Sequence, residues 1–192
     1  MKIVKKDIER SIHGLKSGKF TSLRAMRIPG VKAVLNYRFG QWLAKQGTIA
    51  KLLLTPIYYW QRSRVQKNWG IDIPREASIG QGLVVGHFGN IFISKHAVIG
   101  KNLNISHGVT IGMSGKGEAR GVPEIGNNVY IAPGAKVFGK IKIGDNVKIG
   151  ANAVIYRDIP PNSVVVLKPG FEIISSSSER EQEIREREIN FK

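Results

Sequence analysis

The sequence predicts a mostly β fold, a triangular parallel β-helix with a short α-helical N-terminal segment before it and a charged C-terminal tail after it. Aliphatic residues recur every six residues between residues 77 and 155, and glycine often follows directly. A period of six is not helical, and simple alternation would not keep glycine at a constant phase. Each hexapeptide can supply one short strand and one turn, so that three form one coil with the aliphatic residue inside.

The repeat keeps its phase over most of this region. Nine of its eleven intervals are six residues long. The aliphatic positions are Ile79, Val85, Ile93, Ile99, Ile105, Ile111, Ile125, Ile131, Val137, Ile143, Ile149 and Ile155. Twelve hexapeptides predict about four coils, whereas a short-stranded β-sandwich, the alternative, would not hold this phase. A solenoid cannot cover its own ends or faces, so we expect an oligomer.

The phase breaks at two places. Eight residues separate Val85 from Ile93, and fourteen separate Ile111 from Ile125. Extra residues in a coil are pushed outward as loops, and loops on a rigid scaffold are where sites are found. The breaks contain residues 86–90 and 113–122, which we take as the two candidate site loops.

Charge divides the chain into three parts, residues 1–70, 71–170 and 171–192. The first part has 15 basic and 2 acidic residues, and therefore carries most of the net charge of +16. The absence of cysteine excludes disulfides and cysteine nucleophiles and is compatible with a cytoplasmic protein. The N-terminal residues lack the apolar segment of a signal peptide.

The basic segment is expected to be helical over residues 2–27, with interruptions at Gly14 and Gly18, and again over 31–46 and 49–68, with a break at Pro29-Gly30. Basic residues around an aromatic face are typical of helices on an anionic membrane, here the inner face of the cytoplasmic membrane. Alternatively, these aromatics pack on the solenoid end or on another subunit. Nucleic acid binding is less favoured because no such motif is present.

Two prolines, Pro160 and Pro161, are expected to end the coils, with a last strand over residues 164–167. The tail then contains four serines at 175–178 and alternating Glu and Arg over 179–192. This alternation indicates either a solvated helix or a disordered segment, and we assign it no chemistry.

His87 is the strongest catalytic candidate among the four histidines, because it lies in the first break. A loop histidine can take a proton from a hydroxyl, and Asp72, nearly one coil earlier, could fix its tautomer. His107 is one coil beyond His87. His13 and His96 are expected on the surface, and His87 could also be a solvent-exposed histidine without a role. Nothing arranges three histidines for a metal, so none is expected.

Several motifs together resemble the left-handed β-helix acyltransferases of the serine acetyltransferase type. They are Asp72-Ile73-Pro74, Ile79-Gly80-Gln81-Gly82, Gly86-His87, Val109-Thr110-Ile111-Gly112, Ile149-Gly150-Ala151 and Asp158-Ile159-Pro160-Pro161. The resemblance implies a homotrimer that uses acetyl-CoA at a site between subunits. It also implies direct transfer, with His87 as base, Asp72 stabilising the imidazolium and backbone N–H groups stabilising the oxyanion.

Two departures from that pattern concern the acceptor. Serine acetyltransferases carry Asp where this chain has Gly86, and an Arg-His pair where it has Gly121-Val122. The missing charges would hold an amino acid, so we expect the acceptor not to be serine. The run from His107 to Gly112 is closer to the colanic-acid biosynthesis acetyltransferases, which implies a sugar hydroxyl of a surface polysaccharide, with His107 assisting across the subunit boundary.

The resemblance also indicates where the acyl donor binds. The corresponding positions are Gly112, Met113, Pro133 and Ala151, with Lys148, Lys168 and Arg157 as candidates for the CoA phosphates. Two alternatives to the sugar acetyltransferase stay open. One is a serine or other small-molecule O-acetyltransferase, and the other is a non-catalytic scaffold docked to membrane by residues 1–70.

Overall fold

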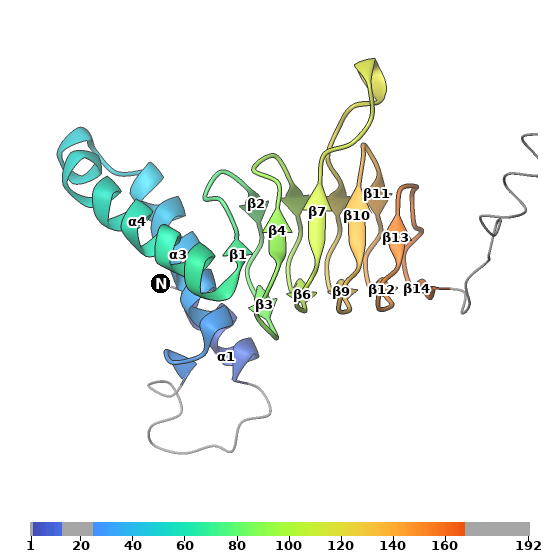
Figure 1. Cartoon of the computed structure of the whole chain (residues 1–192), viewed down its shortest axis with the longest axis horizontal. Coiled ribbons are helices and arrows are strands. Elements are labelled where there is room, and N and C mark those ends of the chain that lie inside the picture. The colour runs from blue at the N-terminus through green and yellow to red at the C-terminus, as the bar shows by residue number, and fades with distance from the viewer. Residues whose placement is uncertain (1, 13–24, 168–192) are drawn as a thin grey trace, which may run out of the picture.

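The computed structural model describes residues 2–12 and 25–167, and it has a helical end and a solenoid end (Figure 1). The helices are α1 (Lys2–Ser11), α3 (Pro29–Ala44) and α4 (Thr48–Trp69). The expectations for Gly14, Gly18, His13, Lys168 and the charged tail lie outside the described residues.

Short parallel strands form the solenoid, and they are arranged in three sheets. The first sheet contains β1 (Ile71–Asp72), β4 (Ile91–Ile93), β7 (Thr110–Gly112), β10 (Lys136–Phe138) and β13 (Val154–Ile155). The second contains β2 (Ser78–Ile79), β5 (Val98–Ile99), β8 (Glu124–Ile125) and β11 (Lys142–Ile143). The third contains β3 (Val84–Val85), β6 (Asn104–Ile105), β9 (Tyr130–Ile131), β12 (Lys148–Ile149) and β14 (Val164–Val165).

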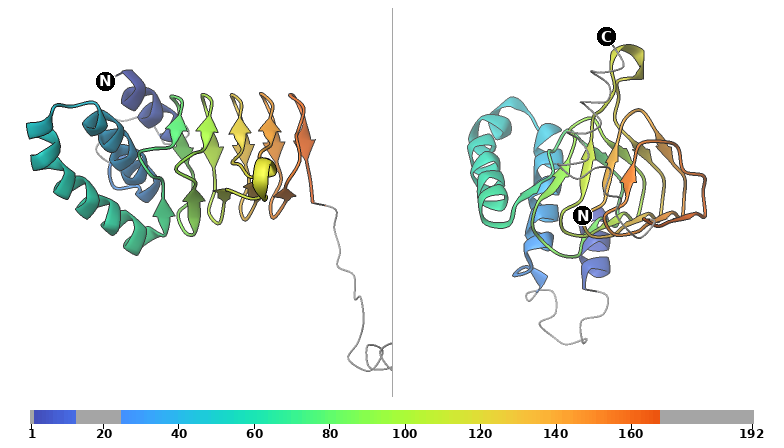
Figure 2. Two further views of the ribbon diagram at one scale, coloured as in Figure 1. Left: turned by 90° about the horizontal axis from the view of Figure 1, so that it is seen from above. Right: turned by 45° about the vertical axis from the view of Figure 1, so that its right-hand side comes forward.

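The chain visits the three sheets in turn, as a left-handed β-helix does, and the coils stack along one axis (Figure 2). The strand register shows where the two breaks fall. Ile71 pairs with Ile91, twenty residues later, and Thr110 pairs with Lys136, twenty-six residues later. Phe92 pairs with Thr110 and Lys136 with Val154, each eighteen residues later, and in the last coil Lys148 pairs with Val164, sixteen residues later. The extra residues therefore leave the coils at the predicted loops, without shifting the strands.

The aliphatic repeat forms the core of the solenoid. All twelve positions of the six-residue phase are buried, from Ile79 to Ile155. The residues two positions before them, such as Leu83, Leu103 and Val147, are also buried. This confirms the inward set predicted from the period.

One corner of the solenoid carries a ladder of asparagine side chains. Asn102, Asn128, Asn146 and Asn162 all have a positive φ between 57° and 63°. The Nδ2 of each of the first three donates to the Oδ1 of the next residue in the ladder, at 2.8 to 3.0 Å. Asparagine tolerates the left-handed conformation that such a corner needs, and its amide links one coil to the next.

The observed helices follow the predicted ones closely, with one correction. Pro29 and Gly30 were expected to be a break, but they are the first two residues of α3. Proline suits the first helical turn because its missing N–H would have no helical partner there. Gly30 is required for packing, since a Cβ at this position would lie 2.2 Å from the carbonyl oxygen of Val85.

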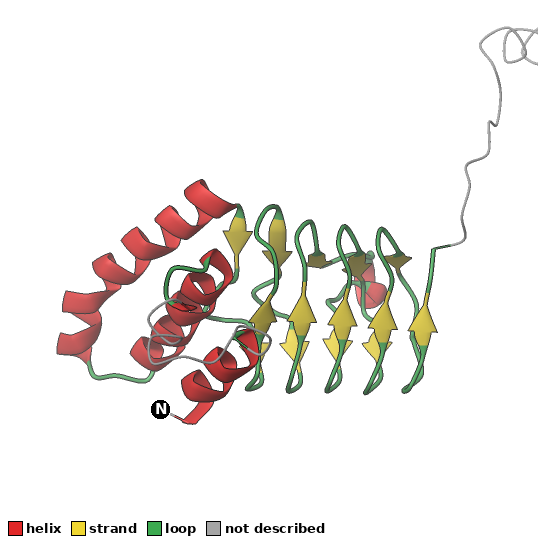
Figure 3. Ribbon diagram, turned by 90° about the horizontal axis from the view of Figure 1, so that it is seen from below, coloured by secondary structure: helices red, strands yellow, loops and turns green. Residues whose placement is uncertain are grey.

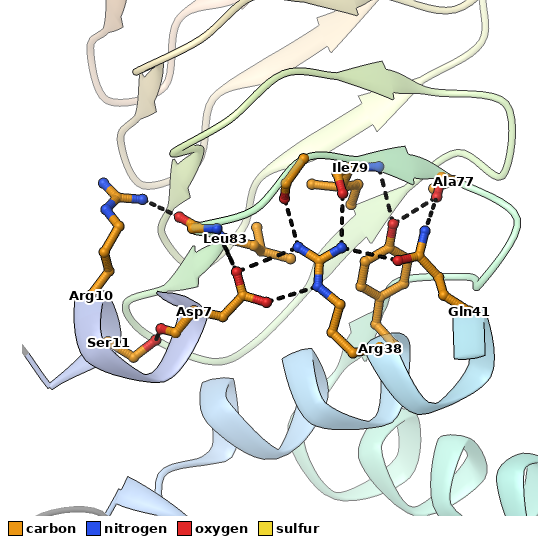
Figure 4. A network of polar contacts seen from close by, with 11 residues as sticks. Asp7, Arg10, Ser11, Arg38, Gln41, Ala77, Ile79 and Leu83 are labelled. Carbon is orange, nitrogen blue, oxygen red and sulfur yellow. Dashed lines mark hydrogen bonds and ion pairs between the residues drawn. The ribbon is translucent and has the colours of Figure 1, made fainter. Parts of the chain in front are cut away.

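The helical end closes the solenoid by filling the unpaired edge of its first coil (Figures 3 and 4). Asp7 of α1 and Arg38 of α3 form a buried ion pair, with Nε and Oδ2 2.7 Å apart. Asp7 Oδ1 accepts hydrogen bonds from the backbone N–H groups of Gly82 and Leu83. The guanidinium donates to the carbonyls of Ile79 and Gly80.

Tyr37 completes this cap beside Arg38. Its hydroxyl donates to the carbonyl of Ala77 at 2.7 Å and accepts from the N–H of Ile79 at 3.0 Å. An exposed sheet edge is a template for pairing with another chain, and these side chains occupy it. The alternative in which the N-terminal segment packs on the solenoid end thus describes α1 and α3.

Candidate active site

The candidate site lies along the solenoid edge where the third sheet turns into the first. Register pairs Val85 with Ile105, Ile105 with Ile131 and Ile131 with Ile149. Two residues further on, His87, His107, Pro133 and Ala151 therefore occupy equivalent corners of successive coils. The expectation that His107 lies one coil beyond His87 is confirmed.

The two imidazoles meet on this edge. Their ring centroids are 5.9 Å apart, the planes are inclined by 78°, and both side chains are exposed. His96 is exposed in an ordinary hexapeptide, as expected. In the described part of the chain, no group of three metal-ligating side chains is gathered.

Backbone hydrogen bonds between corners hold the histidines in place. The N–H of Gly108 donates to the carbonyl of Gly89 at 2.7 Å, and the N–H of Gly134 donates to the carbonyl of His107 at 3.0 Å. Gly108 has φ of 70°, a conformation that favours glycine. The corner that presents His107 is thus rigid, although the side chain itself faces solvent.

Asp72 has a partner that the sequence did not predict. Its Oδ1 accepts a hydrogen bond from Nη2 of Arg62 at 2.7 Å. Burial acts against the charge on Arg62, but the hydrogen bond and the charge of Asp72 prevail, and the pKa of the guanidinium is raised. Within residues 2–12 and 25–167, no hydrogen bond joins Asp72 to His87. The expected Asp72–His87 pair therefore stays a prediction. The observed partner of Asp72 is Arg62, which comes from α4, the helix that directly precedes β1.

A row of outward-facing residues, three of them polar, crosses the first sheet beside the histidines. Asp72 stands in register with Phe92, Phe92 with Thr110 and Thr110 with Lys136. Nζ of Lys136 donates to the carbonyl of Gly108 and to the hydroxyl of Thr110. Sequence reasoning missed Lys136, although its register with Thr110 follows from adding the eight-residue insertion to one coil.

The second break projects from the solenoid between β7 and β8 (Figure 1). Ser114 and Gly121 exchange backbone hydrogen bonds at 3.0 Å, and the short helix η1 (Gly117–Ala119) forms the tip. Gly112 ends β7, and Met113 begins the loop with its side chain exposed. Both lie at the C-terminal end of β7, whereas His107 lies before its N-terminal end, so they occupy different edges of the solenoid.

The residues expected to bind the acyl donor thus fall into two groups. Pro133 and Ala151 share the histidine edge, whereas Gly112 and Met113 lie at the other edge. Lys148 is exposed on the third sheet, three residues before Ala151, and Arg157 is exposed after β13. A ligand that touches both groups must run around the solenoid or between two copies of it.

The chemistry available on this edge is proton transfer. A neutral imidazole can accept a hydroxyl proton, and the second ring can hold or orient a polar group nearby. The chain has no cysteine, so an acyl-enzyme intermediate on a cysteine side chain is excluded. The arrangement suits attack by an alcohol on an activated acyl group.

Comparison with known proteins agrees with this geometry. The family model "Bacterial transferase hexapeptide (six repeats)" matches residues 123–157. The serine acetyltransferase of Mycobacterium tuberculosis is 40% identical over 142 residues, which are 74% of this chain and 59% of that protein. The serine acetyltransferase of Helicobacter pylori (strain 26695) is 39% identical over 141 residues, which are 72% of this chain and 77% of that protein.

The fold extends the likeness beyond sequence. The crystal structure of serine acetyltransferase in complex with coenzyme A from Brucella abortus strain S19 matches with a TM-score of 0.72 and 29% identity. The match covers 88% of this chain and 65% of that one. Because its coils match the hexapeptide model and its sequence covers 77% of the Helicobacter protein at 39% identity, this chain belongs to the serine acetyltransferase family of hexapeptide-repeat transferases.

Proposed function

We propose that this protein is an acetyl-CoA-dependent O-acetyltransferase. The observation that carries the proposal is the pair of imidazoles, 5.9 Å apart on an exposed solenoid edge that continues to Pro133 and Ala151. The related Brucella protein binds coenzyme A on the same fold, which supports CoA as the carrier of the acyl group.

In the proposed reaction the acceptor hydroxyl gives its proton to His87 as its oxygen attacks the thioester carbonyl. The C–S bond then breaks, the acetyl ester is formed, and the sulfur leaves as the thiolate of CoA, which takes the proton from the His87 imidazolium and so restores the base. His107 is the second polar group beside the reacting atoms. Asp72 stabilises the imidazolium at longer range, in competition with Arg62.

Serine is the first candidate for the acceptor. Each curated relative compared above is a serine acetyltransferase. The Mycobacterium protein is longer, and this chain spans 59% of it. The comparisons therefore favour a small hydroxylated acceptor over the polysaccharide expected from the sequence.

A sugar hydroxyl is the second candidate, and Gly86 and Val122 favour it. At these positions the family pattern has charged or imidazole side chains that suit an amino acid. The backbone leaves room at position 86, because a Cβ there would meet nothing closer than 3.6 Å. Gly86→Asp should therefore fold normally. If the missing carboxylate is what excludes the ammonium group of serine, turnover with serine should rise in this variant.

We further propose that the active form is a homotrimer. The solenoid faces carry exposed apolar side chains, including Phe92, Val98 and Val154. The two groups of expected donor contacts also lie on opposite edges of one sheet, so that adjacent copies would unite them. Most soluble homo-oligomers have closed symmetry, and a three-fold arrangement would cover one face of each solenoid.

The experiment that tests the function is an acceptor screen. The purified protein is incubated with acetyl-CoA and with serine, nucleotide sugars or oligosaccharides, and release of free CoA thiol is followed. Acceptor-dependent thiol release supports the proposal, and the preferred acceptor decides between the two candidates. Binding of acetyl-CoA without transfer to any hydroxyl compound would favour a non-catalytic scaffold.

A further inference from the structure

Helix α4 has an apolar stripe on the side that faces away from the protein. Ile49, Leu52, Leu53 and Trp60 are between 59% and 77% exposed. Their spacing of three, four and seven residues places them on one side of the helix. The opposite side holds the buried residues Tyr58 and Val65. The helix therefore packs with one side and leaves a second apolar side uncovered in this chain.

This stripe ends in positive charge. Arg64 and Lys67 follow Trp60 at spacings of four and seven residues, and the Arg64 guanidinium lies 4.8 Å above the Trp60 ring. There is no acidic residue from Arg10 to Ile71. Tryptophan and basic residues beside an aliphatic stripe are the combination that settles at the headgroup level of anionic membranes.

The charge also argues against a second copy of the helical end as the covering partner. Two α4 stripes placed face to face would bring two basic, acid-free segments together, which is repulsive. An anionic lipid surface is complementary to the same segment. Figure 3 shows α4 on the outer side of the helical end, with its C-terminal end at β1. The solenoid also contacts the middle of α4, where Arg75 lies over the rings of Tyr58 and Tyr59.

Of the described helices, none is long and apolar enough to cross a membrane. We propose that the outer stripe of α4, with Ile49, Leu52, Leu53 and Trp60, is a peripheral docking surface for an anionic phospholipid bilayer. The inference is independent of the acceptor. It narrows the contact expected from residues 1–70 to α4, because α1 is held against the first coil through Asp7.

The test is flotation of the full chain with vesicles. Vesicles of phosphatidylcholine with phosphatidylglycerol should carry the protein, and vesicles of phosphatidylcholine alone should carry much less. Salt should weaken the binding because it screens the basic residues. The double variant Leu52→Glu/Leu53→Glu should bind the anionic vesicles at least about tenfold more weakly, since it places two charges in the apolar stripe.

The matched control is Val166→Glu/Leu167→Glu, which adds the same charges to exposed apolar residues at the far end of the described solenoid. It should bind the vesicles like the unchanged protein. Sedimentation velocity tests the other possible partner of the stripe, a second copy of this chain. The Leu52/Leu53 variant should keep the oligomer size, and a smaller assembly would show that the stripe joins copies of this chain. Equal binding by that variant, or equal binding to neutral vesicles, would also overturn the proposal.

Discussion

The carboxylate of Asp72 has two candidate partners, Arg62 and His87. Its hydrogen bond to Arg62 is direct, whereas the family resemblance assigns it to His87. A carboxylate neutralised by a guanidinium supports an imidazolium less than a free one does. The strength of the proposed base should thus depend on a residue of α4.

Arg62→Gln tests that dependence. The variant removes the positive charge near Asp72, so the carboxylate should stabilise the imidazolium of His87 more strongly. The acidic limb of the pH profile of kcat/KM should therefore move to higher pH. Arg64→Gln, on the same helix but over Trp60, is the control and should leave the profile unchanged. An identical limb in both variants would show that Arg62 has only a structural role.

At the scale of elements, the aliphatic phase was sufficient to place every strand that the repeat covers. The reason is that, in a triangular coil with one hexapeptide per side, only one phase of the repeat places all the aliphatic side chains inside. The Asp7–Arg38 pair could not be read in the same way. Thirty-one residues separate its members, and neither belongs to a repeat. Arg62 was missed for a similar reason, since contact across a helix–strand junction has no sequence period.

The Asp7–Arg38 pair should be the strongest single link between the helical end and the solenoid. Asp7→Asn leaves a buried guanidinium uncompensated and weakens the hydrogen bonds from two backbone N–H groups. We expect a loss of about 3 to 5 kcal/mol in the free energy of unfolding, measured by urea denaturation. Glu9→Gln is the control, because Glu9 pairs with Lys5 only at the surface, at 3.8 Å. A loss for Asp7→Asn as small as for this control would refute the assignment.

Tyr37 should make the same cap sensitive to alkali. Burial raises the pKa of its hydroxyl from an ordinary value of 10.0 to about 12. The unfolded chain then releases this proton at lower pH than the folded protein. The contribution of this hydroxyl to the free energy of unfolding is therefore complete below pH 10, and it falls by roughly 2 to 3 kcal/mol as pH rises towards 12. Urea denaturation across this range should show a steeper fall than in Tyr37→Phe, and parallel curves would contradict the prediction.

At the scale of the whole molecule, the residues proposed for the site lie at two edges of the solenoid. The sequence located both loops, but which residues share an edge required the strand register. His87 belongs to one edge and Met113 to the other. If the homotrimer unites them, each complete site takes one edge from each of two neighbouring copies.

Mixed oligomers test this division. His87→Ala removes the base, and Met113→Glu places a negative charge where the anionic donor is expected, so each variant alone should be inactive. Mixed by co-expression, they should regain up to about a quarter of the activity, which is the fraction of sites that random mixing leaves intact. Thiol release from acetyl-CoA is the measurement. Absence of any recovery in oligomers shown to contain both variants would place the site within one copy.

The central claim is that His87 takes the proton of the acceptor hydroxyl. The most direct measurement is kcat for thiol release from acetyl-CoA by His87→Ala, with the acceptor found in the screen. His96→Ala is the matched control, because His96 is exposed in the next coil but lies outside the candidate site loops. We predict that kcat falls by about 100-fold or more for His87→Ala and stays near its original value for His96→Ala. Equal turnover by the two folded variants would contradict this account.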